Sequence, residues 1–267
     1  MSYKIAINGY GRIGRCVLRA FYESTNYADL RIVAINDLAD IGNLAHLTRY
    51  DSTHGRFLGE VEQGDGELMV SGDAIRVSQQ ADVANLAWND LEIDLVMECS
   101  GAFTDRKTAQ IHLANGAKRV LFSQPADSDV DATLVYGINH ETLDTSATII
   151  SNASCTTNCI VPVLKAIDEV FGIDHGVITT IHSAMNDQPV IDSYHHQDLR
   201  KTRSAMQSII PVDTALAKGI ERILPNLNGK LQAQAIRVPT VNVSAMDLTL
   251  TLNSDATIDS VNAALVA

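Results

Sequence analysis

The stretch that decides the fold is KIAINGYGRIGRCVLRAFYES, at residues 4–24. It opens with a short apolar run typical of a buried strand, and the run breaks at Gly9. Beyond the break, Ile13, Val17 and Leu18 recur at the spacing of one helix face. The pattern therefore predicts a strand, a tight turn and a helix.

Three glycines at that turn indicate a phosphate-binding loop. Gly9, Gly11 and Gly14 spell G-x-G-x-x-G, which lets the backbone turn sharply and lets a pyrophosphate approach the helix N-terminus. A second apolar run, LRIVAIND at 30–37, ends in Asp37, where an acid is expected to bind ribose hydroxyls. Such an acid repels an additional 2′-phosphate, so NAD is favoured over NADP. The alternatives are that the glycines form a plain turn and that Asp37 caps the next helix.

The first part of the chain continues as a doubly wound sheet requires. Strands are predicted at 92–101, 118–125, 133–139 and 148–154, with a helix at 104–117 and, as an insertion, a helix and a hairpin with a GDG turn between residues 42 and 72. Strands that alternate with crossovers imply a parallel sheet, whose ligand lies at the carboxyl ends of its strands. Ser100, Gly101 and Ser123 fall at such ends, either as cofactor contacts or as ordinary turn residues.

The pattern changes after residue 154. The sequence predicts a helix from Cys155, an alternating strand at 175–186, a polar loop at 187–209, a helix at 211–225 and two long strands at 230–253 around Pro239. We therefore expect an α/β protein: a doubly wound Rossmann NAD-binding domain at 1–154, then an α+β catalytic domain at 155–267 with a mixed or antiparallel sheet. The last stretch, 255–267, resembles a helix without a capping glycine, so we expect the catalytic domain to be incomplete at its C-terminus.

Composition excludes several classes of protein. The 267 residues carry a formal net charge of −12, which argues against nucleic-acid and anionic-membrane partners. The chain starts without a leader-like pattern and has no run of apolar residues long enough to cross a membrane, so the cytoplasm is the expected location. Its four cysteines form no C-x-x-C pair, so neither a disulfide framework nor a metal site is predicted.

The stretch SNASCTTNC, residues 151–159, raises three alternatives for Cys155: a nucleophile, a redox partner of Cys159, or a small buried residue. A thiol in the first turn of a helix feels the free amides and the helix dipole, which stabilise the thiolate. Cys155 also falls at the predicted domain boundary, where clefts form. His182 comes near the end of the next strand and is the predicted base.

The motifs INGYGRIGR, VAIND, YDSTHG, SNASCTTNC, IIPVDT and RVPT.NVSAMDLT together resemble the phosphorylating glyceraldehyde-3-phosphate dehydrogenase family, in this order and over nearly the whole chain. Within that family, TIHSAMNDQPVID, AMQSIIPVDT and DATLVYGIN are more similar to the D-erythrose-4-phosphate dehydrogenase branch than to the glycolytic one. The resemblance implies an NAD-dependent oxidation of a sugar-phosphate aldehyde by a cytoplasmic homotetramer. The loop from Asp187 to Ser208 resembles the family's inter-subunit loop.

The same resemblance implies residue roles. Cys155 would be the nucleophile and His182 the group that takes its proton. The cofactor contacts would be Gly9, Gly11, Arg12, Ile13, Gly14, Asn36, Asp37, Ser100, Gly101 and Ser123. The substrate and phosphate contacts would be Ser154, Thr156, Lys201, Thr214 and Arg237, with a strand-edge salt bridge as the alternative role of Arg237. The family's later segment, which supplies an asparagine to the nicotinamide, would follow residue 267.

Departures from the glycolytic pattern guide the choice of substrate. Met185 stands where the glycolytic enzyme has a threonine donor, Ala215 where it has glycine, and Lys201 where arginine is usual. A lost donor at Met185 weakens one phosphate site, which suits a longer sugar phosphate and release of the acyl group by water. The resemblance to the erythrose branch therefore implies oxidation of D-erythrose 4-phosphate to 4-phosphoerythronate, in pyridoxal 5′-phosphate biosynthesis. The alternatives are glyceraldehyde-3-phosphate dehydrogenase and an inactive NAD-binding or assembly module.

Overall fold

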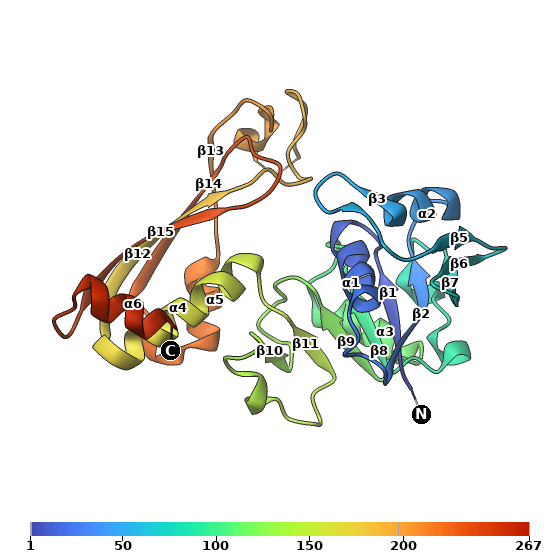
Figure 1. The fold of residues 1–267 in the computed structure, drawn as a ribbon, viewed down its shortest axis with the longest axis horizontal. Coiled ribbons are helices and arrows are strands. Elements are labelled where there is room, and N and C mark those ends of the chain that lie inside the picture. Colours follow the sequence, from blue (N-terminus) through green and yellow to red (C-terminus); the bar gives the residue numbers. More distant parts are fainter. Residues whose placement is uncertain (1, 197, 267) are drawn as a thin grey trace. The chain divides into compact units, whose positions relative to one another are not determined.

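A computed structural model describes residues 2–196 and 198–266, which divide into two compact units (Figure 1). The first unit contains residues 1–134 and 140–153, and the second contains 135–139 and 154–267. The sequence placed the boundary after residue 154, whereas the contacts assign Ser154 to the second unit and add residues 135–139 to it.

The described residues of the first unit build a nine-stranded sheet in the order β10-β11-β9-β8-β1-β2-β7-β6-β5. Its parallel strands are β1 (Tyr3–Asn8), β2 (Leu30–Asn36), β7 (Asp73–Ser78), β8 (Leu95–Glu98), β9 (Arg119–Phe122), β10 (Ala132–Thr133) and β11 (Ile149–Ser151). Its helices are α1 (Arg12–Glu23), α2 (Ile41–Arg49) and α3 (Arg106–Ala114), with 3₁₀ turns at Val83–Asn85, Trp88–Leu91 and His140–Thr142. The parallel order confirms the predicted doubly wound class.

The inserted region adds antiparallel strands to this sheet. Strands β5 (Val61–Gln63) and β6 (Glu67–Val70) form the hairpin expected around the GDG turn, and β6 then pairs antiparallel with β7. A separate two-stranded ribbon joins β3 (Tyr50–Asp51) to β4 (Gly55–Arg56).

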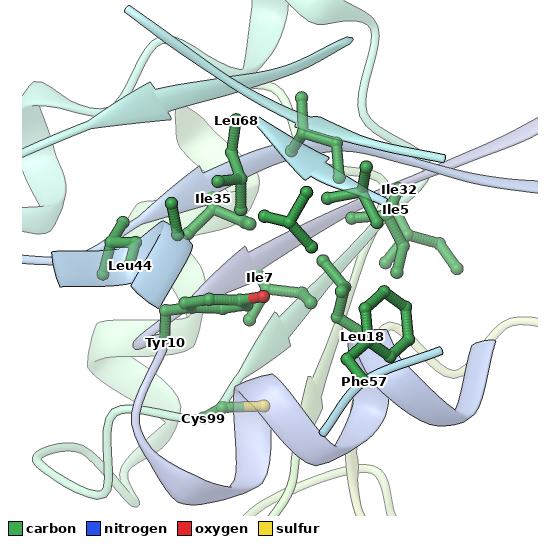
Figure 2. Packing of buried hydrophobic residues seen from close by; sticks show 14 residues of the cluster. Ile5, Ile7, Tyr10, Leu18, Ile32, Ile35, Leu44, Phe57, Leu68 and Cys99 are labelled. Carbon is green, nitrogen blue, oxygen red and sulfur yellow. The ribbon is translucent and has the colours of Figure 1, made fainter. Parts of the chain in front are cut away.

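Apolar side chains from both faces hold this sheet in place. Figure 2 shows one cluster, in which Ile7 of β1 and Ile35 of β2 pack with Leu18 of α1 and Leu44 of α2; all four are at most 1% exposed. Burial of a side chain of this size contributes roughly 1.5–3 kcal/mol. The packing fixes the carboxyl ends of β1 and β2, which carry the glycine turn and Asp37.

One predicted strand is wrong. Residues 133–139 were expected to be extended, but strand structure there ends with β10 at Thr133. The Asn139 side chain accepts the Val135 N–H at 2.8 Å, and Gly137 has φ +84°, so the chain turns. A local side-chain bond therefore outweighs the apolar pattern of this stretch.

The second unit contains a four-stranded sheet in its described residues, in the order β13-β14-β12-β15. The strands are β12 (Ile173–His182), β13 (Ile210–Val212), β14 (Leu231–Arg237) and β15 (Ala245–Leu252). Strands β12 and β14 are parallel and the other pairs antiparallel, which confirms the predicted mixed sheet. Helices α4 (Cys155–Phe171) and α5 (Leu216–Ile223) pack on β12 and β14, and α6 (Ile258–Val266) packs on α4 (Figure 1).

Element ends in the second unit differ from the prediction in two places. The helix expected from residue 211 starts at Leu216, because Ile210–Val212 pairs with β14 instead. The last helix begins at Ile258 rather than Asp255, and Ala267 lies outside the described residues. Short 3₁₀ turns occur at Leu199–Thr202 and Pro225–Leu227. Across residues 2–196 and 198–266, each helix is too short or too polar to span a membrane.

Candidate active site and dinucleotide pocket

A cavity of about 340 Å³ opens at the carboxyl ends of β1, β2 and β8 in the first unit. Five of the predicted cofactor contacts line it: Gly9, Gly11, Asn36, Asp37 and Ser100. The remaining wall includes Asn8, Leu38, Gln80, Cys99 and Phe103, which the sequence reasoning did not single out.

The other predicted cofactor contacts lie next to these residues in the chain or on a neighbouring strand end. Arg12 and Ile13 are exposed in the first turn of α1, and Gly101 directly follows Ser100. Gly14 is buried, and a Cβ atom there would lie 2.4 Å from the Gly9 carbonyl oxygen. Ser123 follows β9, with its hydroxyl bonded to the Gln124 side chain.

The glycine turn fits a dinucleotide. Gly9 has φ +89°, and a Cβ atom there would lie 2.3 Å from the Ser100 Cα, so only glycine allows this close approach. Within the described chain no side chain caps the N-terminus of α1 at Gly11, which leaves that end suited to an anion. The Asp37 carboxylate accepts the N–H groups of Tyr10 (2.7 Å) and Ala39 (3.0 Å), so it is held beside the turn.

The second unit holds the predicted nucleophile and base together. Cys155 is the first residue of α4, and Ser154 caps the helix by accepting the Thr157 N–H at 2.9 Å. His182 is the last residue of β12. The Cys155 Sγ and His182 Nε2 atoms are 3.7 Å apart, within reach of a thiol–imidazole hydrogen bond (Figure 1 labels both elements).

A backbone carbonyl fixes which imidazole nitrogen faces the sulfur. His182 Nδ1 lies 2.7 Å from the Ser183 carbonyl oxygen. Because a carbonyl only accepts, Nδ1 carries a hydrogen and the neutral ring turns its Nε2 lone pair to Cys155. The proton of the thiol therefore has a defined acceptor.

The electrostatics of this pair favour the ionised form. The hydrogen bond to His182 lowers the pKa of Cys155, and the backbone amides of Thr156 and Cys155 add to this against the opposing effect of burial. The same hydrogen bond raises the pKa of His182, aided by the Ser183 carbonyl. Proton transfer from sulfur to imidazole is favoured from both sides.

The structure discriminates among the alternatives for Cys155. Cys155 is exposed, so it is not the small buried residue of the third alternative. Cys159 is also exposed and is a free thiol, one turn further along α4.

Two of the predicted phosphate contacts meet at a residue that the sequence reasoning missed. Asp187 accepts Lys201 Nζ at 2.7 Å and Arg237 Nη1 at 3.0 Å. The alternative salt bridge of Arg237 is thus present, and Arg237 also lies opposite His182 in the β12–β14 register. Two cations share one carboxylate, so the cluster keeps one positive charge beside the catalytic pair.

Asp187 is ionised in this cluster. Burial acts to raise its pKa, but the hydrogen bonds from Lys201 and Arg237 outweigh burial and hold that pKa below its ordinary value. The Asp187 carboxylate holds the side chains of Lys201 and Arg237 in place, but its single negative charge neutralises only one of their two positive charges.

The hydroxyl residues of the predicted anion sites occupy helix starts. Ser154 Oγ lies 3.0 Å from Thr156 Oγ1 and 2.7 Å from Thr157 Oγ1, so it is part of a hydroxyl cluster at the start of α4. Thr214 precedes α5, where its hydroxyl accepts the Leu216 N–H at 3.2 Å. Thr214 also lines a second cavity of about 410 Å³, together with Asp213, Ala215, Ala217 and Lys218.

A dinucleotide-binding unit followed by a unit with an activated cysteine–histidine pair defines a class, the NAD-dependent oxidoreductases that act through a thiol. Comparison with known families gives two matches. Residues 3–106 match the model described as "Glyceraldehyde 3-phosphate dehydrogenase, NAD binding domain". Residues 154–267 match "Glyceraldehyde 3-phosphate dehydrogenase, C-terminal domain". The chain belongs to the glyceraldehyde-3-phosphate dehydrogenase family, and its cofactor is NAD.

Proposed function

We propose that this NAD-dependent oxidoreductase oxidises D-erythrose 4-phosphate to 4-phosphoerythronate, a step of pyridoxal 5′-phosphate biosynthesis. The observation that supports aldehyde oxidation most directly is the 3.7 Å contact between Cys155 Sγ and His182 Nε2. The choice of the four-carbon substrate is supported by the sequence resemblance and by Met185, which is 47% exposed and offers no hydrogen-bond donor where the glycolytic enzyme has threonine.

The proposed steps of aldehyde oxidation follow from the Cys155–His182 pair. The Cys155 thiolate attacks the aldehyde carbon and forms a C–S bond, while the proton of the thiol resides on His182 Nε2. That proton neutralises the oxyanion, giving a thiohemiacetal, and His182 then removes it again as the carbon is oxidised. Bound NAD supplies the acceptor for the hydride. The product is a thioester on Cys155, which water cleaves to the free acid and the thiol.

The developing oxyanion also needs donors. The Cys155 N–H stands at the first position of α4, where helix amides have no intrahelical acceptor. His182 Nε2–H supplies a second donor once the ring is protonated. A preorganised donor of this kind contributes about 3 kcal/mol to the transition state.

A comparison of two aldehydes tests the proposal. We expect kcat/KM for D-erythrose 4-phosphate to exceed that for D-glyceraldehyde 3-phosphate by about tenfold or more, the size of a difference of about 1.4 kcal/mol. NADH formation should proceed without inorganic phosphate, because water releases the acid. A preference for the triose together with strict dependence on phosphate would instead identify the glycolytic activity. Absence of turnover with both aldehydes would favour the inactive module, against which the activated Cys155–His182 pair argues.

The Arg237 site gives a second test, of phosphate recognition. Replacing Arg237 with leucine is expected to raise KM for the sugar phosphate by roughly 10- to 100-fold, since a charged hydrogen bond is worth about 1.5–3 kcal/mol. The measurement compares D-erythrose 4-phosphate with unphosphorylated D-erythrose. Only the phosphorylated substrate should be affected.

Arg31 offers a control outside the second unit, because it also pairs with an aspartate, Asp73, at 3.5 Å but is an exposed residue of the first unit. Arg31→Leu should leave both KM values unchanged. An equal loss with both aldehydes in Arg237→Leu would show that Arg237 serves the structure of the strand end rather than the phosphate.

We further propose that the enzyme assembles as a cytoplasmic homotetramer. The loop that resembles the family's inter-subunit loop exposes Val190, Ile191 and Tyr194 by 69%, 75% and 84%. Apolar exposure on this scale suits a surface that another chain covers. The four free thiols suit a reducing compartment.

A further inference from the structure

Beneath the dinucleotide cavity lies a buried polar network centred on Glu98, a residue that the catalytic chemistry does not use. Glu98 ends β8 and is 0% exposed, as is His112 of α3. The network crosses the carboxyl ends of adjacent strands, because β8 pairs with β1 and β1 pairs with β2. Asn8 and Asn36, at the ends of β1 and β2, belong to it and also line the cavity.

Both oxygens of Glu98 accept hydrogen bonds. Oε1 accepts the Ser100 backbone N–H at 2.8 Å and the Ser100 hydroxyl at 2.5 Å. Oε2 accepts Asn8 Nδ2 at 2.6 Å and lies 3.2 Å from His112 Nε2.

The direction of each bond is fixed by groups that can only donate or only accept. Asn36 Oδ1 accepts the Gln80 N–H at 2.9 Å and Asn36 Nδ2 donates to the Gln80 carbonyl at 2.9 Å, so this amide cannot be reversed. Asn36 Nδ2 also donates to Asn8 Oδ1 at 2.7 Å. Asn8 must therefore turn its NH₂ group to Glu98.

The histidine side is fixed in the same way. The indole N–H of Trp88 can only donate, and it donates to His112 Nδ1 at 3.0 Å. The hydrogen of the neutral ring is therefore on Nε2, which donates to Glu98. With the Ser100 N–H as the third fixed donor, Glu98 accepts on both oxygens, and an amide at this position would turn an N–H toward one of these donors.

This carboxylate connects directly to the dinucleotide turn. Glu98 accepts the Ser100 backbone N–H, and Gly9 packs directly against this same backbone. The contact is so close that a Cβ atom at Gly9 would lie 2.3 Å from Ser100 Cα. The Ser100 hydroxyl in turn accepts the Ala102 N–H at 3.1 Å, and Ala102 also lines the cavity. A shift of Glu98 therefore moves the floor of the pocket and the glycine turn together.

We propose that Glu98 is a positioning residue for NAD: its buried, acceptor-only carboxylate fixes Ser100 and the Asn8–Asn36 amide pair against the Gly9 turn. The inference concerns NAD binding by the first unit. It does not depend on which aldehyde the enzyme oxidises.

The decisive variant is Glu98→Gln, which keeps the size of the side chain. Either orientation of the new amide directs an N–H at a fixed donor, Ser100 N–H on one side or Asn8 NH₂ on the other. A buried polar group left without a partner has a large effect, so we expect NAD to bind about tenfold more weakly. Titration calorimetry measures the Kd for NAD in the absence of aldehyde. In turnover, KM for NAD should rise while KM for the aldehyde stays unchanged.

Two control variants separate positioning from general destabilisation. Leu68→Ala opens a cavity at a residue of β6 that is 0% exposed and lines neither the network nor the dinucleotide cavity, so it should lower Tm while leaving the Kd for NAD within about twofold of wild type. Glu92→Gln removes an exposed carboxylate that pairs with Lys4 and should change neither quantity. A wild-type Kd in folded Glu98→Gln, or equal losses of NAD affinity in Glu98→Gln and Leu68→Ala at matched Tm, would overturn the proposal.

Glu98→Asp keeps the test open if Glu98→Gln does not fold. Aspartate retains the carboxylate but is one methylene shorter, so it cannot reach Ser100 and Asn8 together. We expect a Kd for NAD that is a few-fold weaker than wild type, with the Glu92→Gln control unaffected. An unchanged Kd in this variant would equally contradict the proposal, whatever the aldehyde assays give.

Discussion

Replacing Cys155 with serine is expected to lower kcat/KM for the aldehyde on the order of 10⁴-fold or more. Removal of a nucleophile that acts as a unit with its base has effects of this size. Serine keeps the shape of the first turn of α4, but its hydroxyl ionises far less readily than the thiol whose pKa His182 lowers. Steady-state NADH formation and iodoacetamide labelling provide the two measurements.

Cys159 supplies the matched control for this variant. It lies on the same helix and is likewise an exposed free thiol. Cys159→Ser should retain wild-type kcat/KM and the fast phase of labelling. If Cys155→Ser kept most of the activity, or if Cys155 were labelled no faster than Cys159, the proposed covalent chemistry would be wrong.

Replacing His182 with asparagine is expected to lower kcat by roughly 10²- to 10⁴-fold, the usual contribution of a positioned acid–base group. It should also move the alkylation of Cys155 to higher pH. The sign follows from the pair: the bond to His182 is the main cause that lowers the pKa of the thiol, so its loss leaves burial to raise that pKa. Wild-type protein should therefore react below the pH at which a free thiol ionises, near 8.5, and the variant should not.

His175→Asn is the control for this experiment. His175 lies on the same strand, is exposed, and bonds to Asp174 and Thr251 rather than to Cys155. Its replacement should leave the pH profile of alkylation unchanged. An unshifted profile in His182→Asn would show that the helix amides alone activate the sulfur.

Features that depend on neighbouring residues in the chain could be predicted from the sequence. The glycine turn follows from spacing, because Gly9 and Gly11 must occupy a tight turn between an apolar strand and a helix. Cys155 was predicted at the start of a helix, and the structure adds that Ser154 caps this helix by accepting the Thr157 N–H. His182 was predicted at a strand end, and the structure adds the 3.7 Å contact that spacing alone could not supply.

Long-range pairing accounts for what was missed. Asp187 lies 14 residues from Lys201 and 50 from Arg237, in a polar loop without periodicity, so no local signal joins them. Glu98 left a usable signal, since a charged residue inside a buried strand requires partners. The partners themselves, 90 residues away at Asn8 and 14 away at His112, depend on the strand order.

All the groups that lower the pKa of Cys155 lie in the second unit, and this has a practical consequence. His182, the Ser183 carbonyl and the amides of α4 all belong to residues 154–267, so the lowering of the Cys155 pKa does not require a bound cofactor. An exposed thiolate is the form that peroxide oxidises to sulfenic acid. We therefore expect peroxide to oxidise Cys155 in the resting enzyme faster than an ordinary free thiol, and a reductant to preserve activity during preparation.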